Sequence, residues 1–199
     1  MKISRTGAID QSGASTGSTR ERLLESALTL MRKSGLSGAG INEVVRESGA
    51  PKGSVYHFFP DGKEQIVTEA LSVHSGRIAE FIEAAMSPKR TPEKKVKALF
   101  EAFAERFEQG GFEYSCPAGT VCLDLQPHDN DLRRAVAASL EHYLQTIAAQ
   151  LESLGRTRAL AIAGVALSAI EGAYVRGRAL ESSAPFREAG AWLSQLVRR

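Results

Sequence analysis

The chain has 199 residues, of which 43% are hydrophobic and 24% charged, a composition typical of a soluble globular protein with one or two small domains. Two cysteines exclude a disulfide framework, and a net charge of +2 is too small to establish nucleic-acid binding by itself. No secretory signal is visible, and the longest apolar stretch, residues 159–170, is too short to span a bilayer. We therefore expect a cytoplasmic protein.

Residues 1–18 are rich in Ser, Gly and Thr and have no apolar period, so a flexible N-terminal tail is expected. The alternative is a basic arm that touches DNA through Lys2 and Arg5. A helix follows over residues 19–34, with Thr19 as its N-cap and Gly35 as its end.

Residues 41–63, INEVVRESGAPKGSVYHFFPDGK, are the most informative part of the chain. Apolar residues at helical spacing predict a short helix from Ile41. Gly49 permits a sharp turn, and Pro51 suits the first turn of a second short helix over residues 52–59. Two short helices joined by a tight turn indicate a helix-turn-helix, whose second helix enters the major groove of DNA.

These residues resemble the TetR family of bacterial transcriptional regulators. The resemblance is carried by GAPKGSVYHFF at 49–59, by the Lys-Glu pair at 63–64, and by TRERLL at 19–24. The extra glycine in FPDGKE, residues 59–64, is similar to the LmrA/YxaF-like branch. One departure is Ala39-Gly40, where many members have a Ser or Thr cap, because glycine is a weaker N-cap.

The start of the second short helix offers groups that can contact DNA. A lysine can bind guanine or phosphate, serine can donate to phosphate or bases, and glycine lets the backbone approach the duplex. The resemblance implies the same roles, and the candidate DNA contacts are Lys52, Gly53, Ser54, Tyr56, His57 and Lys63. Val55 and Phe59 are expected in the core, Phe58 fits either place, and His57 has a capping or core role as its alternative.

The remaining chain has helical spacing interrupted by proline and glycine. We expect helices from residue 63 to Pro88, from Pro92 to Gly110, over 118–124, from 130 to Gly155, over 157–180 and after Pro185. The expected fold is all-α with about nine helices. A three-helix DNA-binding domain would span residues 19–62, and a helical ligand-binding and dimerisation domain would span 63–199.

A short recognition helix reads few base pairs, so specific binding to a double-stranded operator needs two copies about 34–36 Å apart or a multiple of that. A two-fold homodimer supplies them. The resemblance implies a four-helix interface built from residues 157–180 and 185–199. Small residues on the first helix and Trp192, Leu193 and Leu196 on the second suit it. The alternative places the first helix at the centre of one protomer, and both can hold for different faces.

The resemblance also implies a pocket for a small-molecule effector between the helices over 92–110, 130–155 and 157–180. The candidate ligand-binding residues are Phe103, Phe107, Phe112, Cys116, Tyr143 and Tyr174. Such pockets are mostly apolar with few polar groups, although an aromatic stripe is more often plain core than pocket lining. A flat apolar or aromatic compound is expected, and no cofactor.

The sequence therefore predicts a ligand-responsive regulator, most simply a repressor released from a pseudo-palindromic operator. One alternative is a sensor of electrophiles or oxidants through Cys116 or Cys122, although no Lys, Arg or His lies close in sequence to lower a thiol pKa. An enzyme is not expected, because no nucleophile elbow, phosphate loop or carboxylate pair is present. A helical scaffold for protein partners is a further alternative.

The histidines outside the helix-turn-helix give little further information about function. The run HDND at 128–131 is better explained as a cap of the helix from residue 130 than as a metal site. His74 and His142 are lone helical residues with expected structural roles, and His74 is expected where the pocket meets the DNA-reading part.

Overall fold

The computed structural model describes residues 17–198, which form nine α-helices, one short 3₁₀ turn and no strand, so the all-α prediction is confirmed. The elements in chain order are α1 (Thr19–Gly38), α2 (Ile41–Ser48), α3 (Lys52–Phe58), α4 (Lys63–Met86), α5 (Pro92–Gln109), α6 (Pro117–Asp124), α7 (Asn130–Gln150), the 3₁₀ turn (Glu152–Leu154), α8 (Arg156–Leu180) and α9 (Ala184–Val197). The expected tail and DNA-touching arm, up to residue 16, lie outside the described residues, as does residue 199.

The start of α1 differs from the sequence prediction. Ser18, not Thr19, is the N-cap, and it forms a capping box in which Ser18 and Glu21 each accept a hydrogen bond from the other's backbone N–H. Gly35 has a φ of 68° and interrupts the helix where its end was expected, but helical turns resume and continue to Gly38. The left-handed conformation at this break is one that glycine adopts without a steric penalty.

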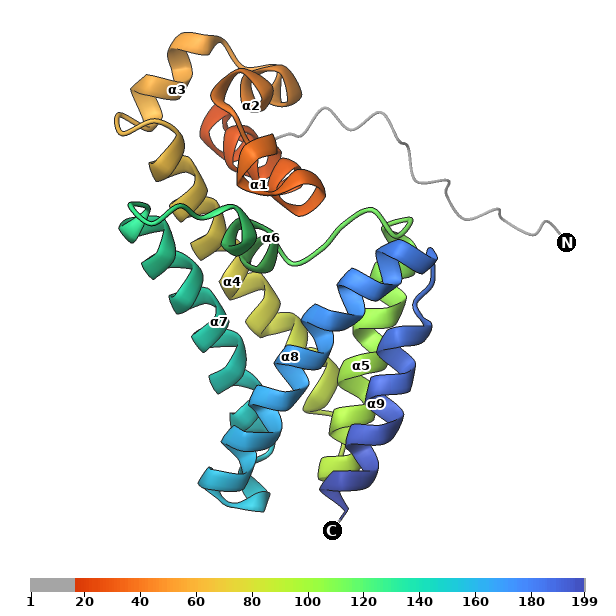
Figure 1. The fold of residues 1–199 in the computed structure, drawn as a ribbon. Coiled ribbons are helices and arrows are strands. Elements are labelled where there is room, and N and C mark those ends of the chain that lie inside the picture. Colours follow the sequence, from red (N-terminus) through yellow and green to blue (C-terminus); the bar gives the residue numbers. More distant parts are fainter. Residues whose placement is uncertain (1–16, 199) are drawn as a thin grey trace, which may run out of the picture.

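The helices form two connected parts (Figure 1). The short helices α2 and α3 pack with α1 at one end, and we call α1–α3 the DNA-reading unit. Helix α4 runs from this unit along the body and contacts α1, α5 and α7. In the body α7 packs on α8, α8 packs on α9, and α9 pairs with α5. The short α6 lies between α1 and α7, so it touches both parts.

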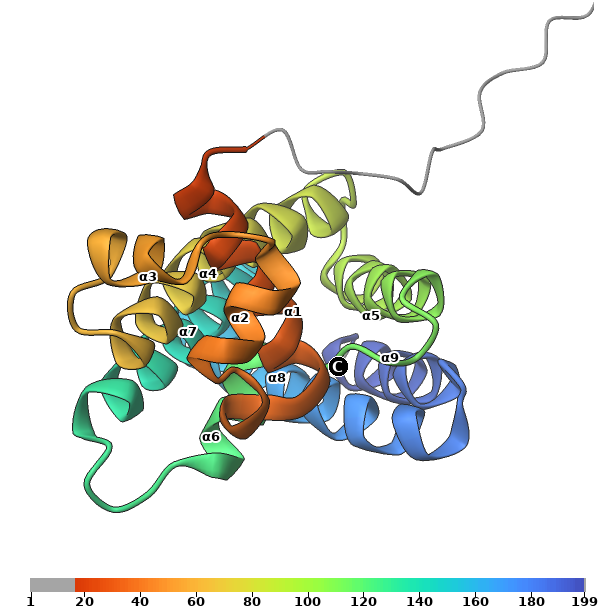
Figure 2. The same cartoon turned by 90° about the horizontal axis from the view of Figure 1, so that it is seen from above.

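Helices α5 and α9 are neighbours in the view from above (Figure 2) and run side by side along most of their length (Figure 1). The apolar face expected on α5 is confirmed: Val96, Leu99 and Phe100 are fully buried. Gly190 of α9 packs over Phe100, and a Cβ atom at residue 190 would lie 2.5 Å from the Cβ of Phe100. The two backbones can approach this closely because residue 190 has no side chain.

Helix α8 is longer than its most apolar stretch. By length and composition alone, Arg156–Leu180 could cross a membrane. The prediction that this part of the chain is too short to span a bilayer, which considered only residues 159–170, is therefore wrong. A core helix of a globular fold meets the same criteria. One face of α8 does bury Ala159, Ala163 and Ala166 against its neighbours.

Candidate DNA-reading helix and ligand pocket

The turn between α2 and α3 has the expected construction. Gly49 ends α2 in a left-handed conformation with a φ of 62°, and Pro51 precedes the first residue of α3. Val55 and Phe59 are fully buried, as predicted, and anchor the seven-residue α3 from its inner side. The guanidinium of Arg20 lies 5.2 Å from the centre of the Phe59 ring, so α1 also supports this anchor.

The opposite side of α3 faces outward. Lys52, Gly53, Tyr56 and His57 are exposed, and Ser54 is half-buried. Nothing lies within 4 Å of a Cβ built at Gly53, so packing within the chain does not require glycine there. This open position is compatible with close approach of another molecule.

Lys63 begins α4 and is half-buried beside α3. The glycine before it, Gly62, has a φ of 67°, and a Cβ atom built on Gly62 would lie 3.8 Å from Cε1 of Tyr56. The extra glycine of the FPDGKE segment therefore makes the left-handed turn that joins α3 to α4.

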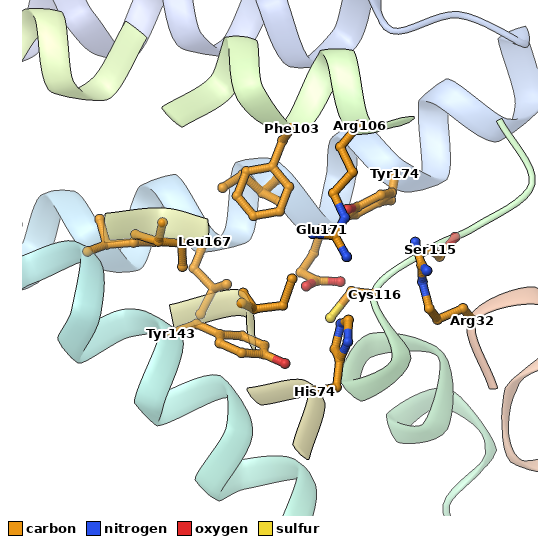
Figure 3. Close-up of a pocket in the computed structure, with 14 residues that line it drawn as sticks. Arg32, His74, Phe103, Arg106, Ser115, Cys116, Tyr143, Leu167, Glu171 and Tyr174 are labelled. Carbon is orange, nitrogen blue, oxygen red and sulfur yellow. The ribbon is translucent and has the colours of Figure 1, made fainter. Parts of the chain in front are cut away.

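A pocket lies in the body below the DNA-reading unit, where five helices and the segment before α6 converge (Figure 3). Its walls come from α1, α4, α5, α7 and α8. The lining residues are Arg32, His74, Ile78, Ile82, Phe103, Arg106, Ser115, Cys116, Tyr143, Ile147, Leu167, Ile170, Glu171 and Tyr174. Charged and polar groups thus share the pocket with an apolar wall.

Burial and mutual repulsion set the protonation of these groups. Burial, and then the nearby Arg106, lowers the pKa of Arg32. Burial also lowers the pKa of His74 to about 3, with Arg32 and Arg106 adding to the effect, so this imidazole is neutral at pH 7. Burial raises the pKa of Glu171. The positive charge of the pocket therefore resides on the two guanidinium groups.

The pocket is nearly closed in this structure. The cavity volume is about 20 Å³, enough for roughly one water molecule. A neighbouring apolar groove of about 500 Å³ runs between α6 and α8 on the outside. Four residues line both spaces and separate them: Ser115, Cys116, Glu171 and Tyr174. A ligand of drug-like size requires these walls to move.

Comparison with known proteins identifies the family to which the chain belongs. Residues 92–191 match the family model described as "Transcriptional regulator LmrA/YxaF-like, C-terminal domain", which covers half of the chain. The chain belongs to the TetR family. Residues 23–70 also match the N-terminal model of the tetR family of bacterial regulatory proteins. The protein is thus a DNA-binding transcriptional regulator, and the families it matches are regulators and not enzymes.

Individual relatives agree with this placement in the TetR family. The chain is 27% identical to the transcriptional regulator LmrA of Bacillus subtilis over 93% of this chain and all of LmrA. It is 35% identical to YxaF of the same organism over 55% of this chain and 58% of YxaF. The crystal structure of reduced NemR from Escherichia coli has a TM-score of 0.76, with 24% identity, 88% of this chain and 94% of NemR covered. That structure shows the shared fold.

Four of the six predicted ligand-binding residues line the pocket of this TetR-family chain: Phe103, Cys116, Tyr143 and Tyr174. Phe107 and Phe112 do not line this pocket. The Phe107 ring turns toward Phe112, with ring centres 5.3 Å apart, and toward Phe186, 5.4 Å away. It also packs over Gly177, where a Cβ would lie 2.6 Å from its ring. Both rings therefore belong to an aromatic cluster that joins α5, α8 and α9.

Three charged residues line the pocket that were not predicted to do so: Arg32, Arg106 and Glu171. Charged residues on amphipathic helices normally face solvent, and Arg32 belongs to the expected DNA-binding domain. His74 is buried in the pocket wall beneath the DNA-reading unit, where it was expected. His142 instead shares a 3.0 Å hydrogen bond with the Ser75 hydroxyl. The predicted apolar pocket is therefore more polar than expected.

The two cysteines differ in environment. Cys116 is buried and Cys122 is exposed. Burial raises the pKa of the Cys116 thiol well above its ordinary value, and the adjacent Glu171 raises it further. Cys116 is therefore a neutral thiol at pH 7, which is a poor nucleophile.

Near residue 130 the structure corrects one detail. Asp129 occupies the N-cap position of α7 but makes no capping bond, because its carboxylate accepts a 2.7 Å hydrogen bond from the backbone N–H of Gln126. Within residues 17–198 no three His, Cys, Asp or Glu side chains are placed to hold a metal ion.

Proposed function

We propose that this TetR-family regulator is a cytoplasmic homodimeric repressor, released from a pseudo-palindromic operator when a small molecule binds the pocket. The main support is the origin of the pocket lining. Arg32 comes from α1 of the DNA-reading unit, His74 from the connecting α4, and Arg106 from α5 of the body. A ligand that contacts all three changes how the DNA-reading unit is held.

The outer face of α8 supports the proposed dimer. Its exposed or half-exposed stripe repeats every three or four residues and consists of small or apolar side chains with one serine: Ala161, Val165, Ser168, Gly172, Val175 and Ala179. On α9 the Trp192 side chain is 71% exposed and Leu196 is also exposed. Small residues at helical spacing allow a second helix to pack closely, and exposed aromatic area favours association. We infer that these faces of α8 and α9 meet their copies in a four-helix interface.

The proposed DNA contacts follow from the exposed side of α3. Lys52 and Lys63 would neutralise phosphates, and Tyr56 and His57 would donate to phosphate oxygens. Ser54 would contact phosphate or a base edge, and Gly53 would let the backbone approach the groove. The dimer places two copies of this helix on one face of the duplex. The division into domains at residue 62 is part of the same proposal.

Release requires that the ligand bind one conformation more tightly than the other. The nearly closed pocket provides a difference in affinity between two conformations, because a cavity of 20 Å³ must expand before it can admit a ligand. Helix α4 lines the pocket and begins directly after α3. Widening therefore moves the support of the recognition helix and changes the distance between the two copies.

The test is selection of preferred duplexes from a random DNA pool by the purified protein. A pseudo-palindrome is expected, and selection of no sequence at all would overturn the proposal. On the selected operator, Lys52→Ala and Tyr56→Phe should each weaken binding about tenfold, a loss of about 1.4 kcal/mol. Lys97→Ala, at an exposed position on α5, should bind like the unchanged protein. The dimer mass should be the same in all three variants, so unchanged operator affinity of both α3 variants would refute the assigned helix.

A further inference from the structure

Two arginines face the pocket without an acidic partner. Several other arginines of the chain form ion pairs, as Arg77 does with Glu25 and Arg187 with Glu101. Within residues 17–198, Arg32 and Arg106 form no ion pair and donate no hydrogen bond to a protein group, although both are half-buried. Half-buried guanidinium groups are costly to leave unpaired, and two in one pocket also repel each other.

Aromatic rings hold both guanidinium groups in place. The guanidinium carbon of Arg32 lies 4.6 Å from the centre of the Tyr114 ring, and that of Arg106 lies 5.1 Å from the centre of the Phe81 ring. An aromatic ring that packs against the flat face of a guanidinium group holds the group in one orientation. The N–H donors at its edge remain available, and a carboxylate binds these donors with two parallel hydrogen bonds.

The charges in the pocket do not balance. Two guanidinium groups face one carboxylate, Glu171, and His74 is neutral at pH 7. The sum is +1 with Glu171 ionised and +2 with Glu171 protonated. Figure 3 shows Arg106, His74 and Glu171 converging on the centre of the pocket, with Arg32 at its edge. One added negative group would neutralise the pocket when Glu171 is ionised and would lower the excess to +1 when Glu171 is protonated.

The rest of the lining describes the body of the ligand. Ile78, Ile82 and Leu167 provide an apolar wall, and Phe103 provides an aromatic face. The Tyr143 side chain is 2% exposed, and its hydroxyl has no hydrogen-bond partner among the described residues. A buried hydroxyl without a partner is rare in folded proteins and marks a place for a ligand atom or a water molecule.

We propose that the pocket binds an aromatic carboxylic acid, with its carboxylate between Arg32 and Arg106 and its ring against the apolar wall. This names the effector class of the proposed repressor and rests on that proposed function. The carboxylate links α1 of the DNA-reading unit to α5 of the body, because each helix contributes one arginine. An acid that occupies this position therefore acts directly on the DNA-reading unit.

The experiment compares acids with their neutral amides, which have nearly the same shape. Benzoate, 2-naphthoate and 4-phenylbenzoate are titrated into the full-length protein by calorimetry, each beside its amide. At least one acid should bind at least tenfold more tightly than its amide. Arg32→Gln and Arg106→Gln should each abolish this preference, and Lys97→Gln, exposed on α5, should keep it. Arg32→Lys, which retains the charge but not the fork of donors, should restore part of it.

Three outcomes would overturn the proposal: no acid binds, every amide binds as tightly as its acid, or both glutamine variants keep the preference. The ratio of acid affinity to amide affinity in the unchanged protein tests the proposal even where a variant folds poorly. Selection of operator DNA, carried out without any acid, tests the proposed function separately. A protein that selects a palindrome but binds none of the acids refutes only the effector class. One that prefers the acids through both arginines but selects no DNA refutes the repressor and keeps the pocket chemistry.

Discussion

The backbone N–H of Ser37 donates a 2.9 Å hydrogen bond to Oδ2 of Asp124, which joins the end of α1 to the end of α6. On the other side of the break at Gly35, the Thr120 hydroxyl donates to the carbonyl of Met31 at 2.8 Å. The backbone N–H of Ser115, in the pocket wall, donates to the carbonyl of Arg32 at 3.0 Å. The short α6 therefore holds α1 on both sides of its break, and the segment before α6 forms part of the pocket.

Gly35→Ala should destabilise the protein. Residue 35 has a φ of 68°, and a Cβ there would lie 2.6 Å from Oδ2 of Asp124. The left-handed conformation and the contact together should lower the free energy of unfolding by about 1–3 kcal/mol, measured by urea denaturation. Gly76→Ala is the control, because Gly76 lies within α4 with nothing within 4 Å of its Cβ position. This control should raise stability by about 0.5–1 kcal/mol. An equal effect of both substitutions would contradict the role of the break.

Alkylation should distinguish the cysteines. Iodoacetamide applied to the native protein should modify exposed Cys122 and leave buried Cys116 unmodified, as measured by mass spectrometry of peptides. The reason is that Cys116 lacks both access and a thiolate, since burial raises its pKa. Both should react after unfolding in urea. Faster modification of Cys116 in the native state would instead favour the alternative of a reactive sensor at that residue.

Much of the DNA-reading unit could be predicted because its signals are local. Gly49 and Pro51 mark a turn within a few residues, and the alternation of buried Val55 and Phe59 with exposed Tyr56 follows one short helix. Such features depend on backbone preferences and on the helical period. The ends of α4 and α5, near Pro88, Pro92 and Gly110, were predictable for the same reason, whereas α1 continues past Gly35 and α7 ends before Gly155.

The pocket could be predicted only in part because its lining depends on how five helices cross. Phe103 and Phe107 lie one turn apart on the same face of α5, yet only Phe103 reaches the pocket. Phe107 meets Gly177 and Phe186, which come from helices distant in sequence. Arg32 and Arg106 converge through the same tertiary packing, and nothing in their local sequence distinguishes them from surface arginines.

His74 should make stability depend on pH. Its pKa in the folded protein is about 3, below the ordinary value of 6.5, so between these values the unfolded chain binds more protons. The contribution of His74 is fully present above pH 6.5 and is lost as the pH falls toward 3, by at most about 1.4 kcal/mol per pH unit. Urea denaturation from pH 7.5 to 4.5 should show this slope, and His74→Gln should reduce it. His128→Gln, where the side chain is 83% exposed, should leave the slope unchanged. A slope that His74→Gln leaves intact would assign it to other groups.

The dimer can be tested with two substitutions of equal exposure. Val165 on α8 and Tyr56 on α3 are both 55% exposed. Val165→Arg should place a charge in the proposed interface and lower the mass in solution from that of two chains to that of one, 21.4 kDa. Tyr56→Arg adds the same charge outside the interface and should leave the mass at two chains. Light scattering at micromolar concentration measures both, and a two-chain mass for Val165→Arg would place the interface elsewhere.

The continuity of α1 with the pocket wall limits how such regulators can be recombined. A fragment cut after residue 62 would keep the recognition helix but lose the α6 contacts of Thr120 and Asp124, and it would uncover the apolar underside of α1. We therefore expect that residues 19–62 cannot be joined to the ligand-binding domain of another regulator without loss of stability. A chimera of this chain needs a recipient body whose helix at the position of α6 can make the same contacts with α1.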